Sequence, residues 1–294
     1  MSGWLETYRG VVNAWECDVV DHFTVAYYYD RFSDATLNML AGVGLGQDYM
    51  AETRHALATV DCYTRYLAEL RAGDILHIES GVIDADDKGL RLGHKVIDSA
   101  SGEVAATLEQ RLLHFHLDDR KALPFPAELQ EQALAGRVDW DGEAREERAA
   151  PADDNAFIDT VRDTVKPWEI DVLGHMGFQF YVHRFSAATP QAISAFGITP
   201  AYMRENRIGF STFEFQLRFL RELQAGDRVQ VRSAVMHVGG SSMRVLNRMY
   251  NAGTGELAAE LSQFGVHLDM AARRPKPLPD EIRARGQAMM AATA

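Results

Sequence analysis

The sequence predicts two copies of an α+β domain, each an antiparallel sheet wrapped around a central helix. Three observations lead to this fold class. The chain of 294 residues is long enough for two hydrophobic cores, its second half repeats its first, and both halves show the same succession of hydrophobic patterns. We expect a first domain over residues 1–125, a connector over 126–157 and a second domain over 158–294.

The repeat consists of residues that recur at a constant spacing. Trp15-Glu16-Cys17-Asp18 returns as Trp168-Glu169-Ile170-Asp171, so that Asp171 follows Asp18 by 153 residues. The same offset holds without a gap as far as Pro124 and Pro277. It pairs His22 with His175, Tyr28 with Tyr181, Arg31-Phe32-Ser33 with Arg184-Phe185-Ser186, and Gly73-Asp74 with Gly226-Asp227. A gapless match of this length indicates duplication of one domain.

Each copy begins with a short apolar strand, at 8–15 and 160–168, followed by a helix over about 25–41 and 178–196. Tyr28, Phe32 and Ala35 recur at the three-and-four spacing of a buried helical stripe. In the first copy four strands follow, at about 55–66, 74–83, 90–98 and 104–116, with turns rich in glycine and aspartate between them. The stretch 118–158 is acidic and predicts one helix, at 127–135, and a flexible connector.

Composition narrows the possible functions. The net charge of −12 disfavours nucleic-acid binding, which needs a basic face. No apolar run is long enough to span a bilayer, and residues 1–10 lack the pattern of a signal peptide, so we expect a cytoplasmic protein without a membrane partner. Cys17 and Cys62 lack metal-ligand spacing, which predicts no metal and no cofactor, and activity that persists in EDTA.

The residues that can carry chemistry lie where the first strand meets the helix. Both copies read Trp-Glu-x-Asp-x-x-x-His, and a tyrosine follows ten residues after the aspartate. Backbone N–H groups in the first turn of a helix lack intrahelical partners and can stabilise a developing oxyanion. A carboxylate beside them can attack a carbonyl carbon or activate water. Asp18 and Asp171 are therefore the candidate catalytic residues.

A structural role competes with each of these assignments. An aspartate before a helix is commonly an N-cap, but Asp18 and Asp171 persist while Cys17 has diverged to Ile170, which favours function. For the candidate catalytic residues His22 and His175, packing and catalysis remain equally open. Tyr28 and Tyr181 are expected to fill core space first and to orient a substrate second.

The two copies resemble the 4-hydroxybenzoyl-CoA thioesterase branch of the hotdog superfamily, whose motif is Asp-x-x-Gly-His-x-Asn followed by a tyrosine. Asp171-Val172-Leu173-Gly174-His175 matches it better than the first copy, where Asp21 replaces the glycine. Thr24 and Gly177 stand at the asparagine position. The first copy also resembles thioesterases of carnitine and betaine breakdown, through Phe32-Ser33-Asp34-Ala35-Thr36 and neighbouring residues.

The resemblance implies hydrolysis of an acyl-CoA thioester to the free acid and CoA, with CoA only as part of the substrate. It assigns the aspartate as nucleophile or base and the N–H of Val25 and Phe178 as the oxyanion hole. A hotdog hydratase or dehydratase, a non-catalytic acyl-CoA-binding protein and nucleophilic catalysis by Cys17 are the alternatives. We further expect the two copies to form an internal pseudo-dimer with one continuous sheet, and two chains to associate as a homodimer.

Overall fold

The computed structural model describes residues 3–147 and 150–292. The chain forms two compact units, Met1–Ala144 with Val172–Gly174, and Arg145–Asp171 with His175–Ala294. None of the described helices combines the length and the hydropathy that crossing a membrane requires. The predicted domain boundaries themselves stay predictions.

The first unit holds a five-stranded antiparallel sheet in the order β1-β3-β4-β5-β2, with the short β6 beside β5. Its strands are β1 (Leu5–Val11), β2 (His55–Tyr66), β3 (Ile75–Asp86), β4 (Gly89–Asp98), β5 (Val104–His116) and β6 (Lys121–Ala122). Its helices are α1 (Val25–Gly42), α2 (Gln47–Thr53) and α3 (Ala127–Leu134).

The second unit repeats this arrangement in the order β7-β9-β10-β11-β8, with the short β12 beside β11. Its strands are β7 (Ile158–Thr164), β8 (Ile208–Phe219), β9 (Arg228–Val238), β10 (Ser242–Asn251), β11 (Leu257–Asp269) and β12 (Arg274–Pro275). Its helices are α4 (Phe178–Ala195), α5 (Pro200–Asn206) and α6 (Asp280–Ala288).

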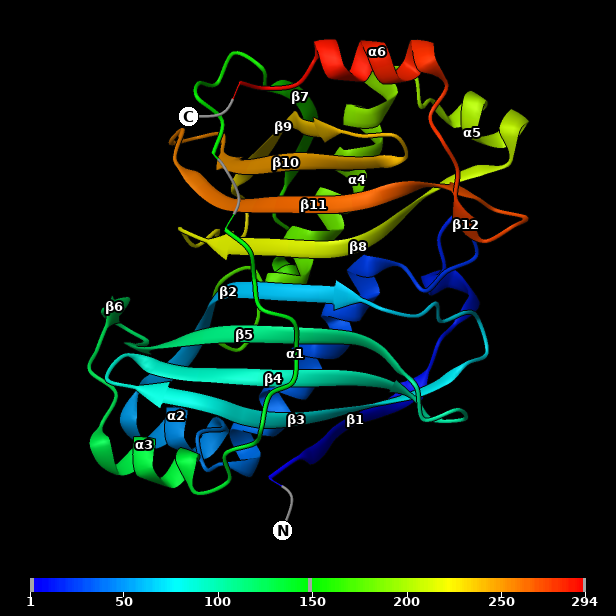
Figure 1. The fold of residues 1–294 in the computed structure, drawn as a ribbon. Coiled ribbons are helices and arrows are strands. Elements are labelled where there is room, and N and C mark those ends of the chain that lie inside the picture. Colours follow the sequence, from blue (N-terminus) through cyan, green and yellow to red (C-terminus); the bar gives the residue numbers. More distant parts are fainter. Residues whose placement is uncertain (1–2, 148–149, 293–294) are drawn as a thin grey trace. The chain divides into compact units, whose positions relative to one another are not determined.

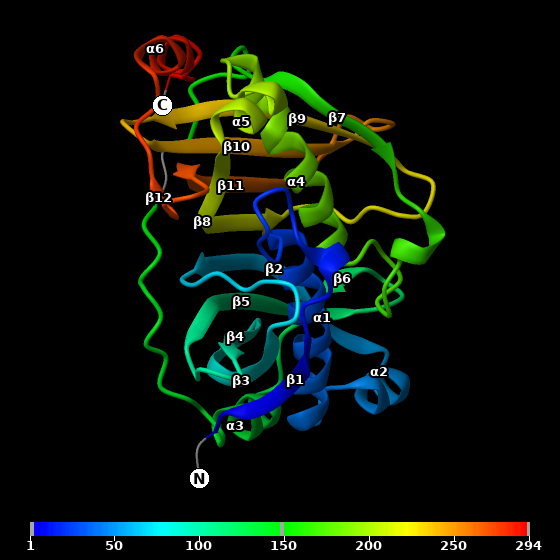
Figure 2. The ribbon, with the colours of Figure 1, turned by 90° about the vertical axis from the view of Figure 1, so that its right-hand side faces the viewer.

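The long helix of each unit lies along one face of its own sheet, as α1 and α4 show in Figures 1 and 2. The predicted stripe faces the sheet, since Tyr28 is 3% exposed and Phe32 and Ala35 are fully buried. Tyr181, Phe185 and Ala188 are equally buried in the second unit. Burial of such side chains is worth about 1.5–3 kcal/mol each for the larger ones, so the helix stripe is a main source of stability. The predicted class, two α+β domains with a central helix, is confirmed.

Two expectations about element bounds were wrong. The first strand was expected to reach Trp15, but β1 ends at Val11 and residues 14–16 form a 3-10 turn. The turn forms because the buried Glu16 carboxylate accepts hydrogen bonds from the backbone and side chain of Asn13, at 2.9 and 3.2 Å. The second copy repeats this departure: β7 ends at Thr164 and a 3-10 turn covers Pro167–Glu169.

Part of the expected connector contacts the first sheet. Val138 is 5% exposed, and its N–H donates to Val82 O at 2.9 Å. Two glycines of the sheet make room for this segment. A Cβ on Gly81 would lie 2.5 Å from Val138, and a Cβ on Gly93 would lie 2.5 Å from Trp140. The segment from 138 to 141 is therefore held against the strands rather than free, and the Lys95–Asp141 ion pair of 2.7 Å adds to that contact.

Candidate functional site

The aspartate and histidine of each copy lie in one loop that ends at the long helix. In the first copy Thr24 N donates to Glu16 O at 2.9 Å and Asp18 N to His22 O at 2.9 Å, with an antiparallel bridge between Cys17 and Phe23. The second copy closes its loop in the same way, with 2.9 Å from Gly177 N to Glu169 O and from Asp171 N to His175 O. Both aspartates are therefore held at fixed positions beside a helix start.

The carboxylate of Asp18 takes part in the structure of its loop. Its Oδ1 accepts the N–H groups of Val20 and His22 at 2.9 and 3.2 Å. The residue is accessible to solvent, yet the surrounding protein removes enough water from the carboxylate to raise its pKa, against the two N–H bonds, which lower it. Asp18 is thus both a loop-stabilising residue and a carboxylate whose pKa is raised by its surroundings.

Asp171 has a histidine as its neighbour. Its Oδ2 lies 4.0 Å from His175 Nδ1, and that nitrogen is also 3.2 Å from Met176 O. The His175 side chain is 15% exposed and that of Asp171 25%. The second copy therefore brings two of the candidate catalytic residues, Asp171 and His175, together at the margin of ion-pair distance.

His22 has a different partner in the first copy. Its Nε2 lies 3.0 Å from Glu69 Oε1, on the segment that follows β2. Glu69 also contacts Arg71, with 3.0 Å between its Oε2 and Arg71 Nη2. Sequence reasoning did not connect Glu69 with the site, although Glu69-Leu70 recurs as Glu222-Leu223 at the repeat offset. The recurrence was the available signal.

The helix starts fit the role proposed for their N–H groups. Helices α1 and α4 begin at Val25 and Phe178, the residues expected to supply the oxyanion donors. Among the described contacts, the N-cap residues Thr24 and Gly177 provide no side-chain oxygen to the first turn. The positive end of each helix dipole thus faces the loop without a capping side chain.

Tyr28 and Tyr181 are core residues. The Tyr28 ring lies 4.5 Å from that of Phe23 and 5.2 Å from that of Tyr66, and the Tyr181 ring lies 5.0 Å from that of Phe219. Burial raises the pKa of both hydroxyls, so both remain protonated. The hydroxyl of Tyr181 donates to Arg221 O at 3.4 Å. Packing is their first role, and orientation of a substrate stays a prediction.

Cys17 is poorly suited to act as a nucleophile. Burial raises the pKa of its thiol, with Asp18 and Asp21 adding to the effect, and the reactive species is the thiolate. Its Sγ lies 3.8 Å from Asn13 O.

The described residues include no group of three or more His, Cys, Asp or Glu side chains arranged to hold a metal ion.

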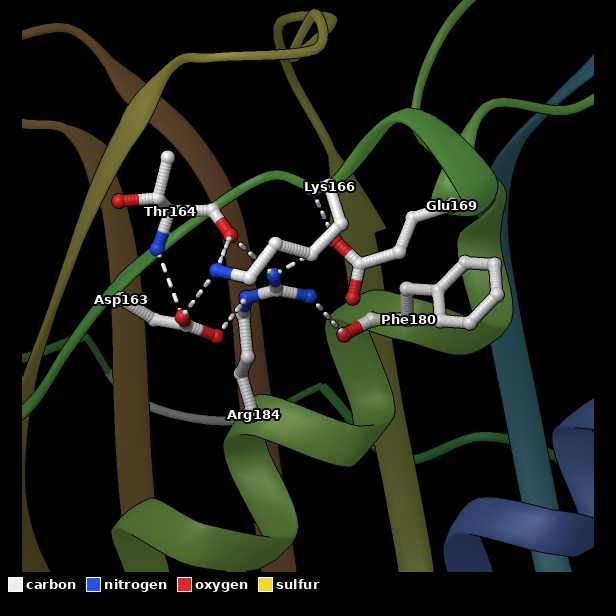
Figure 3. Close-up of polar contacts among 6 residues, drawn as sticks. All are labelled: Asp163, Thr164, Lys166, Glu169, Phe180 and Arg184. Carbon is white, nitrogen blue, oxygen red and sulfur yellow. Dashed lines mark hydrogen bonds and ion pairs between the residues drawn. The ribbon is translucent and has the colours of Figure 1, made fainter.

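The glutamate of the motif anchors the loop to the helix. In the second copy Arg184 Nη2 lies 2.8 Å from Glu169 Oε2, and Arg184 Nε lies 3.1 Å from Asp163 Oδ2 (Figure 3). The same arginine donates to Phe180 O at 3.1 Å and Thr164 O at 3.2 Å.

In the first copy Arg31 pairs with Glu16, and its guanidinium lies over the ring of Tyr8 at 5.3 Å. Sequence reasoning assigned these residues no role, although Glu16, Glu169, Arg31 and Arg184 all recur at the repeat offset. The pairing was missed because fifteen residues separate the partners along the chain.

Known proteins resemble the chain in sequence and in fold. The model of the thioesterase-like superfamily matches residues 12–133 and 165–286. The betainyl-CoA thioesterase of Pseudomonas aeruginosa is 32% identical over 129 residues, which are 44% of this chain and 81% of that protein. The L-carnitine dehydrogenase/betainyl-CoA thioesterase of Agrobacterium fabrum is 35% identical over 125 residues, 42% of this chain but only 25% of that longer protein.

Two solved structures cover nearly the whole chain. A putative oleoyl thioesterase from Lactobacillus plantarum has a TM-score of 0.73 at 13% identity, over 91% of this chain and 99% of that one. The 12:0-ACP thioesterase from Umbellularia californica has a TM-score of 0.72 at 16% identity, over 93% and 95%. At these identities the likeness concerns the fold, and it confirms the prediction of tandem hotdog domains. Because the family model matches both copies, the chain belongs to the thioesterase-like superfamily.

Proposed function

We propose that this protein hydrolyses an acyl-CoA thioester to the free acid and CoA. One observation carries the proposal: in both copies an aspartate is held in a closed loop that leads directly into the uncapped start of the long helix. The helix start offers N–H donors for the oxyanion, and the aspartate offers the nucleophile or base. The names of the relatives make betainyl-CoA the first acyl-CoA to test.

Two routes can lead from the thioester to the free acid and CoA. In the first, the aspartate attacks the thioester carbon, the C–S bond breaks, and CoA leaves as a thiolate that is protonated by solvent. Water then cleaves the resulting anhydride and restores the carboxylate. In the second, the aspartate takes a proton from water, the hydroxide adds to the carbon, and the departing thiolate receives that proton. In both routes the oxygen that gains charge accepts the N–H groups of the first helical turn, Val25 or Phe178.

The histidines have different partners in the two copies. We assign His175 to positioning Asp171, because 4.0 Å separates the two side chains. We assign His22 to positioning the loop that carries Asp18, because its Nε2 contacts Glu69 at 3.0 Å. Because the pKa of Asp18 is raised, its ionised form is lost at a higher pH than for an ordinary carboxylate. Activity that depends on Asp18 should therefore fall on acidification before activity that depends on an unperturbed aspartate.

The test is release of free thiol from betainyl-, acetyl- and benzoyl-CoA by the purified chain, in the presence and absence of EDTA. The Asp18→Asn and Asp171→Asn double variant is the control, because amides in place of both carboxylates nearly preserve shape. We expect thiol release that persists in EDTA and is abolished in the double variant. Saturable binding without thiol release would support the non-catalytic alternative, and hydration of an enoyl-CoA would support a hydratase.

A further inference from the structure

Exposed hydrophobic side chains recur at the same places in both copies. Of the twelve large hydrophobic residues exposed in the described chain, six form three pairs at the repeat offset. Trp15 and Trp168 are 74% and 75% exposed, Val19 and Val172 81% and 51%, and Leu67 and Leu220 54% and 44%. Single exposed hydrophobics are ordinary. The same three exposed in both copies indicate a retained use of that surface.

The three residues of the first copy lie in the loop that carries Asp18 or in the segment bonded to that loop. Trp15 and Val19 belong to the loop itself. Leu67 begins the segment whose Leu70 carbonyl accepts the N–H of Phe23 at 2.7 Å. The second copy has the equivalent bond of 2.8 Å from Met176 N to Leu223 O. We call Trp15, Val19 and Leu67 of the first copy the rim; Trp168 and Leu220 stand at the same repeat positions in the second copy.

The rim is exposed, but the backbone beneath it is fixed. Trp15 precedes Glu16, which is 4% exposed and paired with Arg31 of α1. Val19 precedes Val20, which is 2% exposed and donates its N–H to Asp18. Because the neighbours are anchored, the indole and the valine are presented to solvent at defined positions. A preorganised surface of this kind loses little conformational entropy when a ligand covers it.

We propose that the rim binds the pantetheine arm of the CoA thioester. The proposal rests on the proposed function, since the thioester carbon must lie at the aspartate. Three residues of extended chain reach at most about 10 Å, so the Trp15 backbone lies within that distance of Asp18. A ligand group that packs on Trp15 while the thioester carbon lies at Asp18 is therefore separated from that carbon by a length that the arm can span, which fits the arm better than the distant nucleotide. The arm is uncharged and consists largely of methylene and methyl groups and planar amides, which pack on aromatic and aliphatic side chains.

Substrates that share an acyl group but differ in the thiol part test this assignment. The Trp15→Ala, Trp168→Ala double variant would be assayed with the same acyl group on CoA, on pantetheine and on ethanethiol. We expect KM to rise roughly tenfold for the CoA and pantetheine thioesters, with kcat and the rate on the ethanethiol thioester little changed. The Trp→Phe double variant should recover most of the loss, because it keeps an aromatic face.

Phe213→Ala is the matched control: Phe213 is an exposed aromatic at 37%, and Val60 stands at its repeat position. It should leave all three KM values unchanged. An equal loss on all three substrates in the tryptophan variant would mean that the loop, not the arm, was disturbed, and would overturn the proposal. A change in sedimentation mass would also overturn it, because the rim would then contact a second chain.

A binding measurement separates this proposal from the proposed function. Acrylamide quenches exposed indoles, so pantetheine and CoA should protect the tryptophan fluorescence of the wild-type chain, while 3′,5′-ADP should not. In the Trp15→Ala, Trp168→Ala double variant only Trp4 and Trp140 remain, so its quenching gives the background signal of these two residues. Protection without any thioester hydrolysis would support pantetheine binding at the rim and contradict the proposed thioesterase activity. Hydrolysis without protection by pantetheine would support the proposed thioesterase activity and contradict pantetheine binding at the rim.

Discussion

In each copy a chain of side-chain hydrogen bonds runs through the interior from the edge strand to the long helix, and the two chains differ at one informative position. In the first copy the distances are 2.6 Å from Thr7 to Ser80, 2.6 Å from Ser80 to His94, 3.0 Å from His94 to Gln110 and 2.9 Å from Thr36 to Gln110. Every one of these side chains is buried. The network therefore satisfies polar groups that would otherwise weaken the core.

The second copy has a network at the repeat-equivalent positions, with an amide in place of the imidazole. Thr160 lies 2.8 Å from Ser233, and Ser233 Oγ donates to Asn247 Oδ1 at 2.6 Å. Asn247 Nδ2 then donates to Thr189 at 3.2 Å, and Thr189 donates to Gln263 at 2.7 Å.

The comparison shows that an imidazole and an amide can stand at the same position of a buried network, bond onward to different partners and differ in titration: His94 contacts Gln110, whereas Asn247 contacts Thr189. Burial lowers the pKa of His94 to about 4, whereas Asn247 has no charge to gain. Duplication has therefore retained the positions of the polar side chains, but within this network only the first copy contains an acid-sensitive group.

The largest effect is expected where a buried carboxylate loses its partner. Arg184→Met leaves Glu169 buried and should lower the free energy of unfolding by about 3–5 kcal/mol. Arg31→Met should cost less, because the Arg31 side chain is 16% exposed against 5% for Arg184 and pairs with one carboxylate rather than two. Urea unfolding of both variants measures the difference. Equal losses would show that the two anchors are energetically equivalent.

The histidine of the network should make stability depend on pH. Because the folded pKa of about 4 lies below the ordinary 6.5, the unfolded chain binds more protons between these values. Stability should be complete above pH 6.5 and fall as the pH drops to 4, by up to about 3 kcal/mol from this group. His94→Asn should remove that part of the loss, and Asn247→His should add a similar one. Denaturation midpoints between pH 4 and 7 decide it, and unchanged profiles would contradict the account.

The two aspartates should differ in catalysis. The second copy keeps Gly174 and places His175 beside Asp171, while the first adds the negative charge of Asp21 near Asp18. Asp171→Asn should lower kcat on the order of a hundredfold or more, and Asp18→Asn should lower it less. The kcat values of the two variants are measured by thiol release from the best acyl-CoA, and melting temperatures serve as the folding control. Loss only in Asp18→Asn would reverse the assignment, and two active single variants with an inactive double variant would mean that both sites work.

The smallest effect concerns the turn inside the loop. Gly174 has a φ of +80° and Asp21 a φ of +61°, both in the left-handed region. Gly174→Ala should cost about 1 kcal/mol of stability through the backbone alone, since a Cβ there would meet no atom within 4 Å. Asp21→Gly should be neutral or stabilising. Thermal unfolding of both variants checks the sign, and a stabilising Gly174→Ala would contradict the backbone argument.

Elements with long, regular patterns were predicted closely. The strands at 55–66 and 104–116 have the expected bounds, and both long helices begin where expected. The seven-residue helices α2 and α5 were not predicted, because they carry no buried residue and hence no apolar periodicity. The helix α6 was likewise missed, since only Ile282 and Gly286 of its nine residues are buried.

The sequence by itself determined the duplication, the fold class and the position of the aspartate before the helix, because a constant offset and a periodic hydrophobic pattern are local properties of the chain. The tertiary structure decided the partners. Glu16 contacts Arg31, His22 contacts Glu69 and His94 contacts Gln110 only because the folded sheet and helix bring distant residues together. The perturbed pKa values have the same origin, since burial depends on what the rest of the chain places around a group.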